Sequence, residues 1–188
     1  MRNRQYATIL HALDPLTWLP NRSLFEARLA SAIHCAPRPR SVLAVLLIDL
    51  DRLTEINETL GRGVGDRLLR EAAVRLVRAL DASAVLSRLQ ADDFAAFLEV
   101  ADLAGAAVQA RSLLKHCREP YVIDCLALTV TASIGIALCS SPAEDPADLL
   151  KRAERALIEA KIRGRDCFYP GAATCSDGTD PLLRIARG

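Results

Sequence analysis

Long hydrophobic runs are scarce in this chain of 188 residues. The longest, Val42 to Ile48, is far shorter than the roughly 20 apolar residues that cross a bilayer, and residues 1–13 lack the apolar stretch of a signal peptide. An excess of one charge is also missing, since 24 Lys and Arg oppose 23 Asp and Glu. Such a balance provides no electrostatic field to hold nucleic acid or anionic lipid. We therefore expect a cytoplasmic protein with no nucleic-acid partner and no membrane contact from this segment.

Paired cysteine motifs are absent as well. None of the six cysteines belongs to a C-x-x-C pair, the spacing typical of zinc and redox sites. A chain of this length can bury roughly 70% of its unfolded surface, so it needs neither disulfides nor a structural metal. We expect free thiols in a reducing compartment, at Cys35, Cys117, Cys125, Cys139, Cys167 and Cys175.

What is present is an alternation of helix and strand patterns, which predicts an α/β fold with an antiparallel hairpin in a mixed sheet. The apolar run at residues 42–48 is typical of a central strand buried on both faces. Capping, periodicity and breaker residues predict helices from about Asn21 or Ser23 to 36, over 67–80, over 103–117 and over 146–163. Strands are expected over 85–89, 94–100, 121–123, 126–138 and 166–169.

Composition divides the chain into three predicted parts. Residues 1–13 have apolar residues at helical spacing and are interpreted as a connecting helix. Residues 14–170 form the predicted globular domain. Residues 171–188 are rich in Gly, Ser, Thr and Pro and are interpreted as a flexible tail or linker. Trp18, near the start of the domain, is predicted to pack against it rather than to stack on a ligand.

Two acidic pairs are candidate metal ligands. Asp49 and Asp51 follow the buried strand, and two positions apart on an extended chain their carboxylates point the same way. Asp92 and Asp93 start the second hairpin strand and can reach the same metal. Mg²⁺ suits such a group, because it takes one or two carboxylates and completes its shell with water and phosphate. The alternatives are a surface turn in which Asp51 caps the next segment, and an ordinary polar hairpin turn.

Other polar residues suggest a nucleotide. Asp66 follows a glycine-rich stretch, and with Asn57 it can match the hydrogen-bonding edge of guanine. The alternative is that Asp66 only caps a helix. Lys161 and Arg165 lie at the end of the last helix, where they can clamp phosphates or merely complement the helix dipole.

Four segments occur in a specific order: DPLTWLPNR from Asp14, IDLDRLTEINETLG from Ile48 with Gly65-Asp66, TASIGIA from Thr131, and ALIEAKIRGR from Ala156. Together they resemble the motifs of the GGDEF family, the diguanylate cyclases of bacterial second-messenger signalling. The resemblance implies a palm-like α/β sandwich shared with nucleotide cyclases, a central mixed sheet flanked by helices, and a hairpin that carries the signature.

The resemblance also implies roles for individual residues. Asp49, the backbone carbonyl of Leu50 and Asp92 would hold Mg²⁺ or Mn²⁺, and Asp92 and Asp93 would be the catalytic acidic pair. Asn57 and Asp66 would recognise guanine, while Lys161 and Arg165 would bind the phosphates of GTP. Family members join two GTP molecules as homodimers. The opening segment and the TASIGIA strand resemble those of GGDEF domains joined to an EAL phosphodiesterase domain, so an EAL or sensor domain in a larger parent protein is a further possible partner.

The sequence departs from the family pattern at the signature itself. Gln90-Ala91-Asp92-Asp93-Phe94 stands where the family has G-G-D-E-F, so both glycines are replaced and the second acidic side chain is one methylene shorter. Thr54 replaces a lysine of the family pattern, and the product-inhibition motif R-x-x-D is absent from residues 81–84. Two hypotheses follow. The favoured one is a degenerate domain that acts as a regulatory or interaction module and binds GTP with Mg²⁺, or binds only a partner protein. The alternative is an active diguanylate cyclase without product inhibition.

Overall fold

The computed structural model describes residues 12–35 and 41–171 of the chain. Its helices are α2 (Arg22–His34), α3 (Leu53–Leu60), α4 (Arg62–Ala79), α5 (Leu103–Arg118) and α6 (Pro146–Ile162). Its strands are β1 (Val42–Leu50), β2 (Val85–Gln90), β3 (Asp93–Val100), β4 (Tyr121–Ile123), β5 (Leu126–Leu128), β6 (Ala132–Leu138) and β7 (Phe168–Pro170). None of the helices in this part of the chain has both the length and the apolar composition to cross a bilayer.

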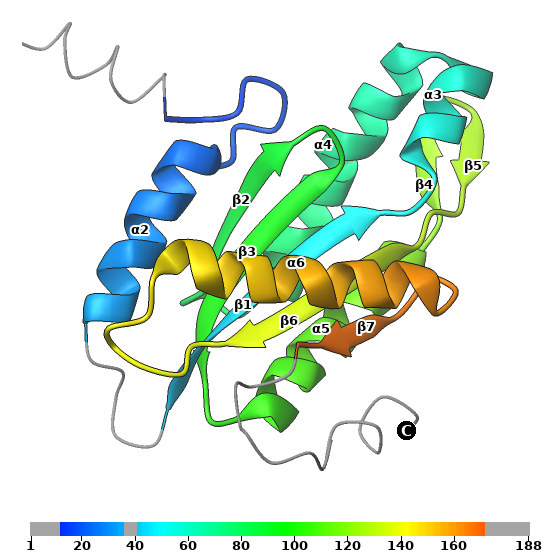
Figure 1. Ribbon diagram of the computed structural model, residues 1–188. Coiled ribbons are helices and arrows are strands. Elements are labelled where there is room, and N and C mark those ends of the chain that lie inside the picture. Colours follow the sequence, from blue (N-terminus) through cyan, green and yellow to red (C-terminus); the bar gives the residue numbers. More distant parts are fainter. Residues whose placement is uncertain (1–11, 36–40, 172–188) are drawn as a thin grey trace, which may run out of the picture.

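The main sheet confirms the predicted mixed topology. Its five strands have the order β2-β3-β1-β6-β7, with β1 antiparallel to both β3 and β6, and β7 parallel to β6. β1 is therefore central, as its continuous apolar run predicts. Figure 1 shows β1 between β3 and β6, with α6 lying across the near face of the sheet.

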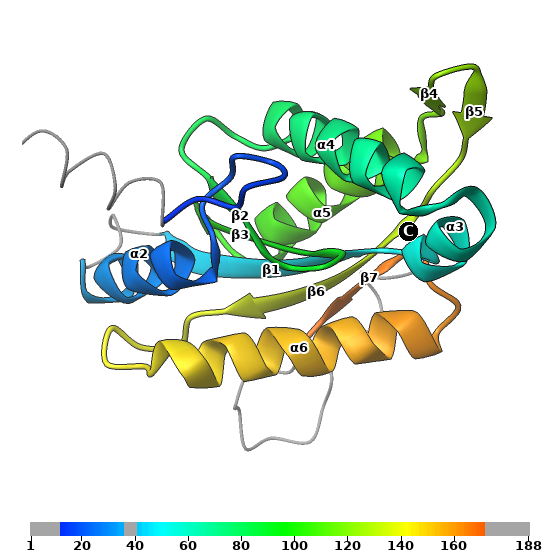
Figure 2. The same cartoon turned by 90° about the horizontal axis from the view of Figure 1, so that it is seen from above.

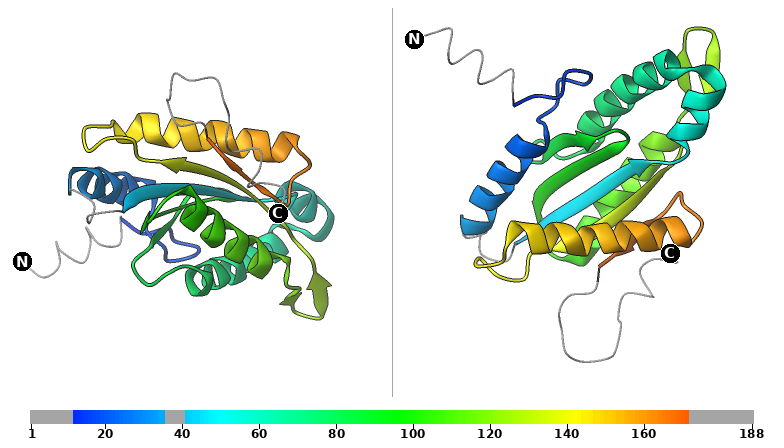
Figure 3. Two further views of the ribbon diagram at one scale, coloured as in Figure 1. Left: turned by 90° about the horizontal axis from the view of Figure 1, so that it is seen from below. Right: turned by 45° about the horizontal axis from the view of Figure 1, so that its top comes forward.

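The alternation of side chains along β1 builds a core on each face of the sheet. Leu43, Val45 and Leu47 pack in a cluster with residues of α2 and α6, whereas Leu46 and Ile48 pack in a cluster with residues of α4 and α5. The helices thus form one layer on each side (Figures 2 and 3). Residues of β1 with odd numbers face α2 and α6, which decides where Asp49 points.

Gly135 explains how closely α6 lies against β6. A Cβ atom at this position would stand 2.1 Å from the carbonyl oxygen of Ala153 and 2.3 Å from the amide nitrogen of Leu157. Both are backbone atoms of α6, so any side chain at Gly135 would push the helix away. The glycine of the TASIGIA segment is therefore needed for packing, and it sets the position of Lys161 further along α6.

Of the two starts predicted for the first helix, Asn21 is the one observed, and its side chain accepts a hydrogen bond from the amide of Leu24. Two other local predictions were wrong. The glycine-rich stretch lies inside α4, so Asp66 stands within the helix instead of capping it. Trp18 is 64% exposed rather than packed.

Other predictions lie partly or wholly outside the described residues. Of the connecting helix predicted over 1–13, only the last two residues are described. One of them, Leu13, forms an isolated bridge with Pro20. The tail over 172–188 lies outside entirely. In the part that the structure describes, the predicted free thiols are present at Cys35, Cys117, Cys125, Cys139 and Cys167.

Candidate functional site

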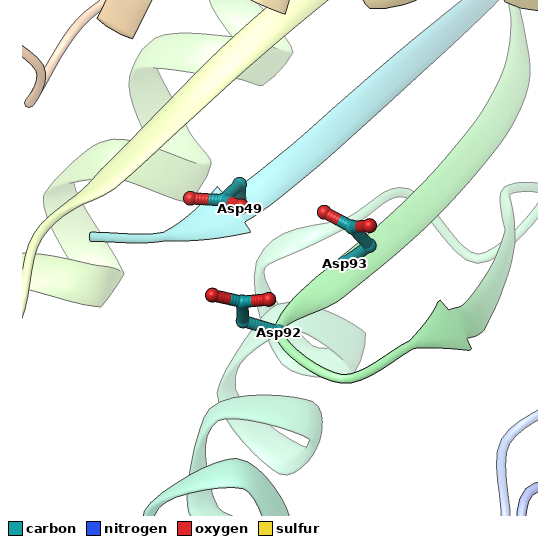
Figure 4. A group of neighbouring side chains, drawn as sticks. All are labelled: Asp49, Asp92 and Asp93. Atoms are coloured by element: carbon teal, nitrogen blue, oxygen red, sulfur yellow. The ribbon is translucent and has the colours of Figure 1, made fainter. Parts of the chain in front are cut away.

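Three carboxylates meet where β1 ends beside the β2–β3 turn. Asp49 is the partner of Asp93 in the antiparallel β1–β3 register, and Asp92 lies in the turn immediately before β3. The carboxylate oxygens of Asp49, Asp92 and Asp93 lie within 4.8 Å of one another, and Figure 4 shows the three side chains around one space. The predicted convergence of the two acidic segments is therefore confirmed for these residues, which we call the carboxylate cluster.

A lysine of α6 lies next to the carboxylate cluster. Because Asp49 follows the odd-numbered side chains of β1, it faces α6, and the Nζ of Lys161 lies 2.6 Å from its Oδ2. Asp49 is 5% exposed. Burial, followed by repulsion from Asp92 and Asp93, raises the pKa of Asp49 to about 6, while the Lys161 ammonium acts to lower that pKa.

The donor set of the cluster fits a hard divalent cation. Its ligands are carboxylate oxygens, which Mg²⁺ and Mn²⁺ prefer over the nitrogen and sulfur donors typical of zinc. Three carboxylates face a single ammonium group, so a bound dication would offset the remaining negative charge. The residues present can therefore hold Mg²⁺ or Mn²⁺, and the family resemblance implies the backbone carbonyl of Leu50 as a further ligand.

The hairpin turn forms with other residues at the positions where the family pattern has glycines. Ala91 has φ +35°, a left-handed conformation that costs a residue with a side chain roughly 1–2 kcal/mol. Gln90 belongs to β2 and does not have a positive φ. Of the two residues that stand in place of glycine, only Ala91 is therefore strained. The Gln90 carboxamide nitrogen donates a hydrogen bond of 3.1 Å to Oδ2 of Asp93.

An arginine braces this strained turn. The guanidinium of Arg88 donates to the carbonyl of Ala91, at 2.9 Å from Nε, and to the carboxylate of Asp14 at 3.0 Å. The Arg88 and Asp14 side chains are 10% and 17% exposed. Although burial acts to raise it, hydrogen bonds from Thr17 and Arg88 hold the pKa of Asp14 below its ordinary value. The DPLT segment thus anchors the signature hairpin.

The two candidate guanine ligands lie on neighbouring helices. Asn57 is on α3 and Asp66 is on α4, one residue after Gly65. A Cβ atom on Gly65 would lie 1.9 Å from Oδ1 of Asn57, so the carboxamide of Asn57 rests directly on the α4 backbone. The side chain of Asp66 is exposed. The residues therefore lie close together where the two helices meet, outside the carboxylate cluster.

Lys161 and Arg165 have different surroundings although they are only four positions apart. Lys161 binds Asp49, whereas Arg165 lies beyond the end of α6, is exposed, and lines a cavity of about 570 Å³. Asp51 lines this cavity too. The prediction that Asp51 joins Asp49 as a metal ligand is not supported, because its carboxylate accepts hydrogen bonds from Thr131, Ser133 and the amide of Asp166.

The alternative in which Asp51 caps the next segment on the surface is wrong. Asp51 is 4% exposed, and α3 begins after Arg52 with no side-chain cap. The extended strand ends at Leu50. The alternation of side chains along a strand, from which Asp51 was expected to point the same way as Asp49, therefore does not apply to Asp51.

The sequence pattern did not predict two ion pairs, one beside the β2–β3 turn and one beside the turn between α6 and β7. Arg88 and Asp14 are 74 positions apart, and Arg118 binds Asp166 across 48 positions. Helical or strand periodicity cannot reveal such pairs. The available signal was an arginine two residues before the signature.

Comparison with protein families and with characterised relatives agrees with this geometry. The family described as the GGDEF domain of diguanylate cyclases matches residues 11–167. The bifunctional diguanylate cyclase and cyclic di-GMP phosphodiesterase MucR of Pseudomonas aeruginosa is 38% identical over 158 residues, which cover 83% of this chain and 23% of MucR. The diguanylate cyclase TpbB of the same species is 40% identical over 172 residues, covering 90% of this chain and 38% of TpbB.

Solved structures give the same result. The GGDEF domain of TpbB from Pseudomonas aeruginosa superposes with a TM-score of 0.80 at 36% identity, covering 85% of this chain and 94% of that one. The diguanylate cyclase SiaD of the same species, solved with its activator SiaC, gives 0.78 at 30% identity, covering 88% of this chain and 64% of that one. The chain spans well under half the length of the relatives MucR and TpbB.

Proposed function

The chain belongs to the GGDEF family of diguanylate cyclase domains, and from this premise we propose that it binds GTP with Mg²⁺ as a regulatory or interaction domain with little or no cyclase turnover. Its place in cyclic di-GMP signalling follows from the family. The observation that carries the proposal is the carboxylate cluster, in which Asp49, Asp92 and Asp93 bring their oxygens within 4.8 Å. Asp49 is buried and Asp92 and Asp93 are half-buried, and the Lys161 ammonium offsets only one of these three like charges, so the cluster supports a bound dication.

Each candidate residue has a role in this proposal. Asp49, Asp92 and the carbonyl of Leu50 hold Mg²⁺ or Mn²⁺. Asn57 and Asp66 bind the guanine edge where α3 meets α4. Lys161 and Arg165 bind the phosphates, and Lys161 exchanges its contact with Asp49 for one with the nucleotide. When bound, the metal lowers the pKa of the attacking hydroxyl and offsets the charge that develops on the phosphate.

Low turnover is supported by the contacts of the signature hairpin. Asp93 is shorter by one methylene than the glutamate of the family pattern, and its Oδ2 is already bound by Gln90. The Gln90 side chain also occupies a position where a glycine would leave the backbone amide open to a phosphate. Thr54 supplies no cation where the family pattern has lysine. Together these changes weaken transition-state binding, and each 1.4 kcal/mol lost lowers the rate about tenfold.

A second candidate function is an active diguanylate cyclase without product inhibition. The conformation of Ala91 favours it, because the turn adopts φ +35° even without glycine and leaves the carboxylate cluster assembled. In that case Asp92 and Asp93 are the catalytic acidic pair.

The partners follow from the same chemistry. Condensation of two GTP molecules needs two copies of the domain, so we propose a homodimer if the protein is catalytic. A larger parent protein carrying an EAL or sensor domain agrees with the partial coverage of the relatives. GTP and Mg²⁺ are both available in the cytoplasm, which is the proposed location.

The two functions are separated by one experiment on a version dimerised through a fused coiled coil. GTP is titrated by calorimetry with Mg²⁺, and the same sample is analysed for cyclic di-GMP by chromatography. Binding without product supports the regulatory domain, whereas binding with product supports the cyclase. A titration without heat of binding overturns both.

A further inference from the structure

The turn between α6 and β7 has an unusual backbone. Gly164, Arg165 and Asp166 have φ values of +114°, +64° and +49°. Glycine adopts such values freely and aspartate tolerates them, but arginine rarely does. Residues in such conformations persist only where their surroundings determine the backbone. Something must therefore hold this turn.

Asp51 holds the turn from the inside. Its carboxylate accepts hydrogen bonds from the amide of Asp166 at 3.1 Å, from Oγ1 of Thr131 at 2.6 Å and from Oγ of Ser133 at 2.7 Å. Asp51 is 4% exposed and forms no ion pair with any described residue. Burying a carboxylate without a cation is costly, and these three hydrogen bonds offset that cost. They connect the residue just after β1 to the start of β6 and to the turn.

Arg118 holds the turn from the outside. Its Nε lies 2.8 Å and 2.9 Å from the two carboxylate oxygens of Asp166, and its second guanidinium nitrogen lies 3.0 Å from the carbonyl of Asp166. Asp51 binds the amide of Asp166 while Arg118 binds its side chain and carbonyl. The backbone of this residue is therefore fixed on both sides.

Arg165 is the residue that this arrangement positions. It lies directly before the fixed Asp166, and it lines the 570 Å³ cavity together with Asp51. We propose that Asp51 and Arg118 are positioning residues, which hold Arg165 so that its guanidinium reaches the outer phosphates of the bound nucleotide. This inference rests on the proposed function and adds to it the residues that orient one phosphate ligand.

The test compares single and double variants of the chain. Affinities for GTP and for GMP are measured by calorimetry with Mg²⁺ for the wild type, Arg118→Ala, Arg165→Ala and the double variant. Arg118 is half exposed, so its removal leaves the core intact. Arg163→Ala is the matched control, because it removes the same charge beside the same turn without touching Asp166. Hydrogen exchange at residues 163–167 is followed in the same samples.

We expect Arg165→Ala to weaken GTP binding about tenfold and Arg118→Ala about threefold. GMP binding should change little, because GMP lacks the outer phosphates. The double variant should be no weaker than Arg165→Ala, since Arg118 acts through Arg165. Arg163→Ala should match the wild type. Arg118→Ala should also speed exchange at the turn, which marks loss of positioning.

A conservative change provides a rescue. Asp51→Asn keeps one oxygen to accept from the Asp166 amide, and its carboxamide N–H can donate to Oγ of Ser133, so this variant should retain more GTP affinity than Asp51→Ala. The inference is overturned if Arg118→Ala binds GTP like the wild type, or if its effect adds fully to that of Arg165→Ala. Failure of the wild type to bind GTP overturns the proposed function and this role together, whereas unchanged exchange in Arg118→Ala overturns the positioning alone.

Discussion

The β2–β3 turn and the α6–β7 turn both contain strained residues, and a different kind of ion pair braces each turn. The β2–β3 turn supplies Asp92, and the α6–β7 turn follows the helix that supplies Lys161. Both contain residues with side chains at positive φ, Ala91 in the first and Arg165 with Asp166 in the second. In each turn an arginine donates to a backbone carbonyl of the strained residue. Backbone strain near the site is thus paired with a side chain that fixes it.

The difference between the turns lies in the burial of their braces. The Arg88–Asp14 pair is nearly buried, at 10% and 17% exposure, whereas the Arg118–Asp166 pair is 50% and 38% exposed. A buried pair is costly to break, and an exposed one contributes little to global stability. The hairpin brace therefore supports the fold, while the brace of the second turn has a local effect. Five predictions test this contrast.

The largest effect on binding is expected at Asp49, which lies beside Asp92 of the hairpin turn and Lys161 of α6. Replacement by Asn removes a charged ligand, so the Mg²⁺-dependent part of GTP affinity should disappear, a loss of at least about tenfold. Calorimetry with and without Mg²⁺ measures it. Asp148→Asn is the matched control, because it makes the same chemical change at a side chain that is 66% exposed on α6. Binding like the wild type would remove Asp49 from the metal site.

The next effect separates the two braces. Arg88→Ala leaves the partly buried Asp14 without its cation, so we expect the free energy of unfolding to fall by about 3 kcal/mol. Arg118→Ala should lower it by less than about 1 kcal/mol. Urea unfolding followed by circular dichroism measures both. Equal losses would contradict the contrast between the turns.

The difference in unfolding free energy between the wild type and Arg88→Ala should also depend on pH. Because the pKa of Asp14 is lowered in the folded protein, the stability that this pair contributes is present above the ordinary aspartate pKa of about 3.9 and is lost as the pH falls through the lower, folded value. The gap between the wild type and Arg88→Ala should therefore narrow in acid. A gap that widens below pH 4 would mean that the Asp14 carboxylate is not the partner that matters.

A smaller effect concerns catalysis at the hairpin. Restoring glycine at both positions, Gln90→Gly with Ala91→Gly, should release Asp93 from Gln90 and remove the strain at Ala91. Any cyclase activity of a coiled-coil dimer should rise at least about tenfold, equivalent to about 1.4 kcal/mol. Chromatography of cyclic di-GMP measures the change. Unchanged turnover in the double variant would show that the hairpin is not the defect.

The smallest effect isolates the strain itself. Ala91→Gly alone should raise stability or leave it unchanged, because relief of positive φ offsets the greater freedom of glycine in the unfolded chain. The control is Ala27→Gly at an exposed position of α2, where the same exchange should cost about 1 kcal/mol. Thermal unfolding measures both variants. A loss of stability in Ala91→Gly as large as that in Ala27→Gly would show that Ala91 is not strained.

Much of the fold could be predicted from local pattern. The apolar run of β1 predicted a central strand, and the hairpin around Ala91 was placed correctly because polar turn residues separate two short apolar segments. The glycines before Asp66 suggest a loop by their spacing, whereas Gly65 lies in α4 and makes room for the close contact of Asn57 with that helix. Local sequence does not distinguish a glycine that bends the chain from one that makes room.

The site was predictable where ligands come from strand ends, and not where distant segments meet. Asp49, Asp92 and Asp93 were found because the strand and the hairpin each place acidic residues at one end. The roles of Asp51 and Arg118 depend on contacts across 115 and 48 positions, which no periodicity encodes. Asp51 resembled a metal ligand by spacing, but burial and three hydrogen bonds give it a structural role.

The most direct test of the account is a calorimetric titration of the wild-type protein with GTP, carried out with Mg²⁺ and again with EDTA in its place. The account predicts saturable binding of one GTP per chain with Mg²⁺ and a loss of affinity of at least about tenfold with EDTA. Binding of equal strength under both conditions, or no binding under either, would contradict the claim that the carboxylate cluster forms a metal-dependent nucleotide site.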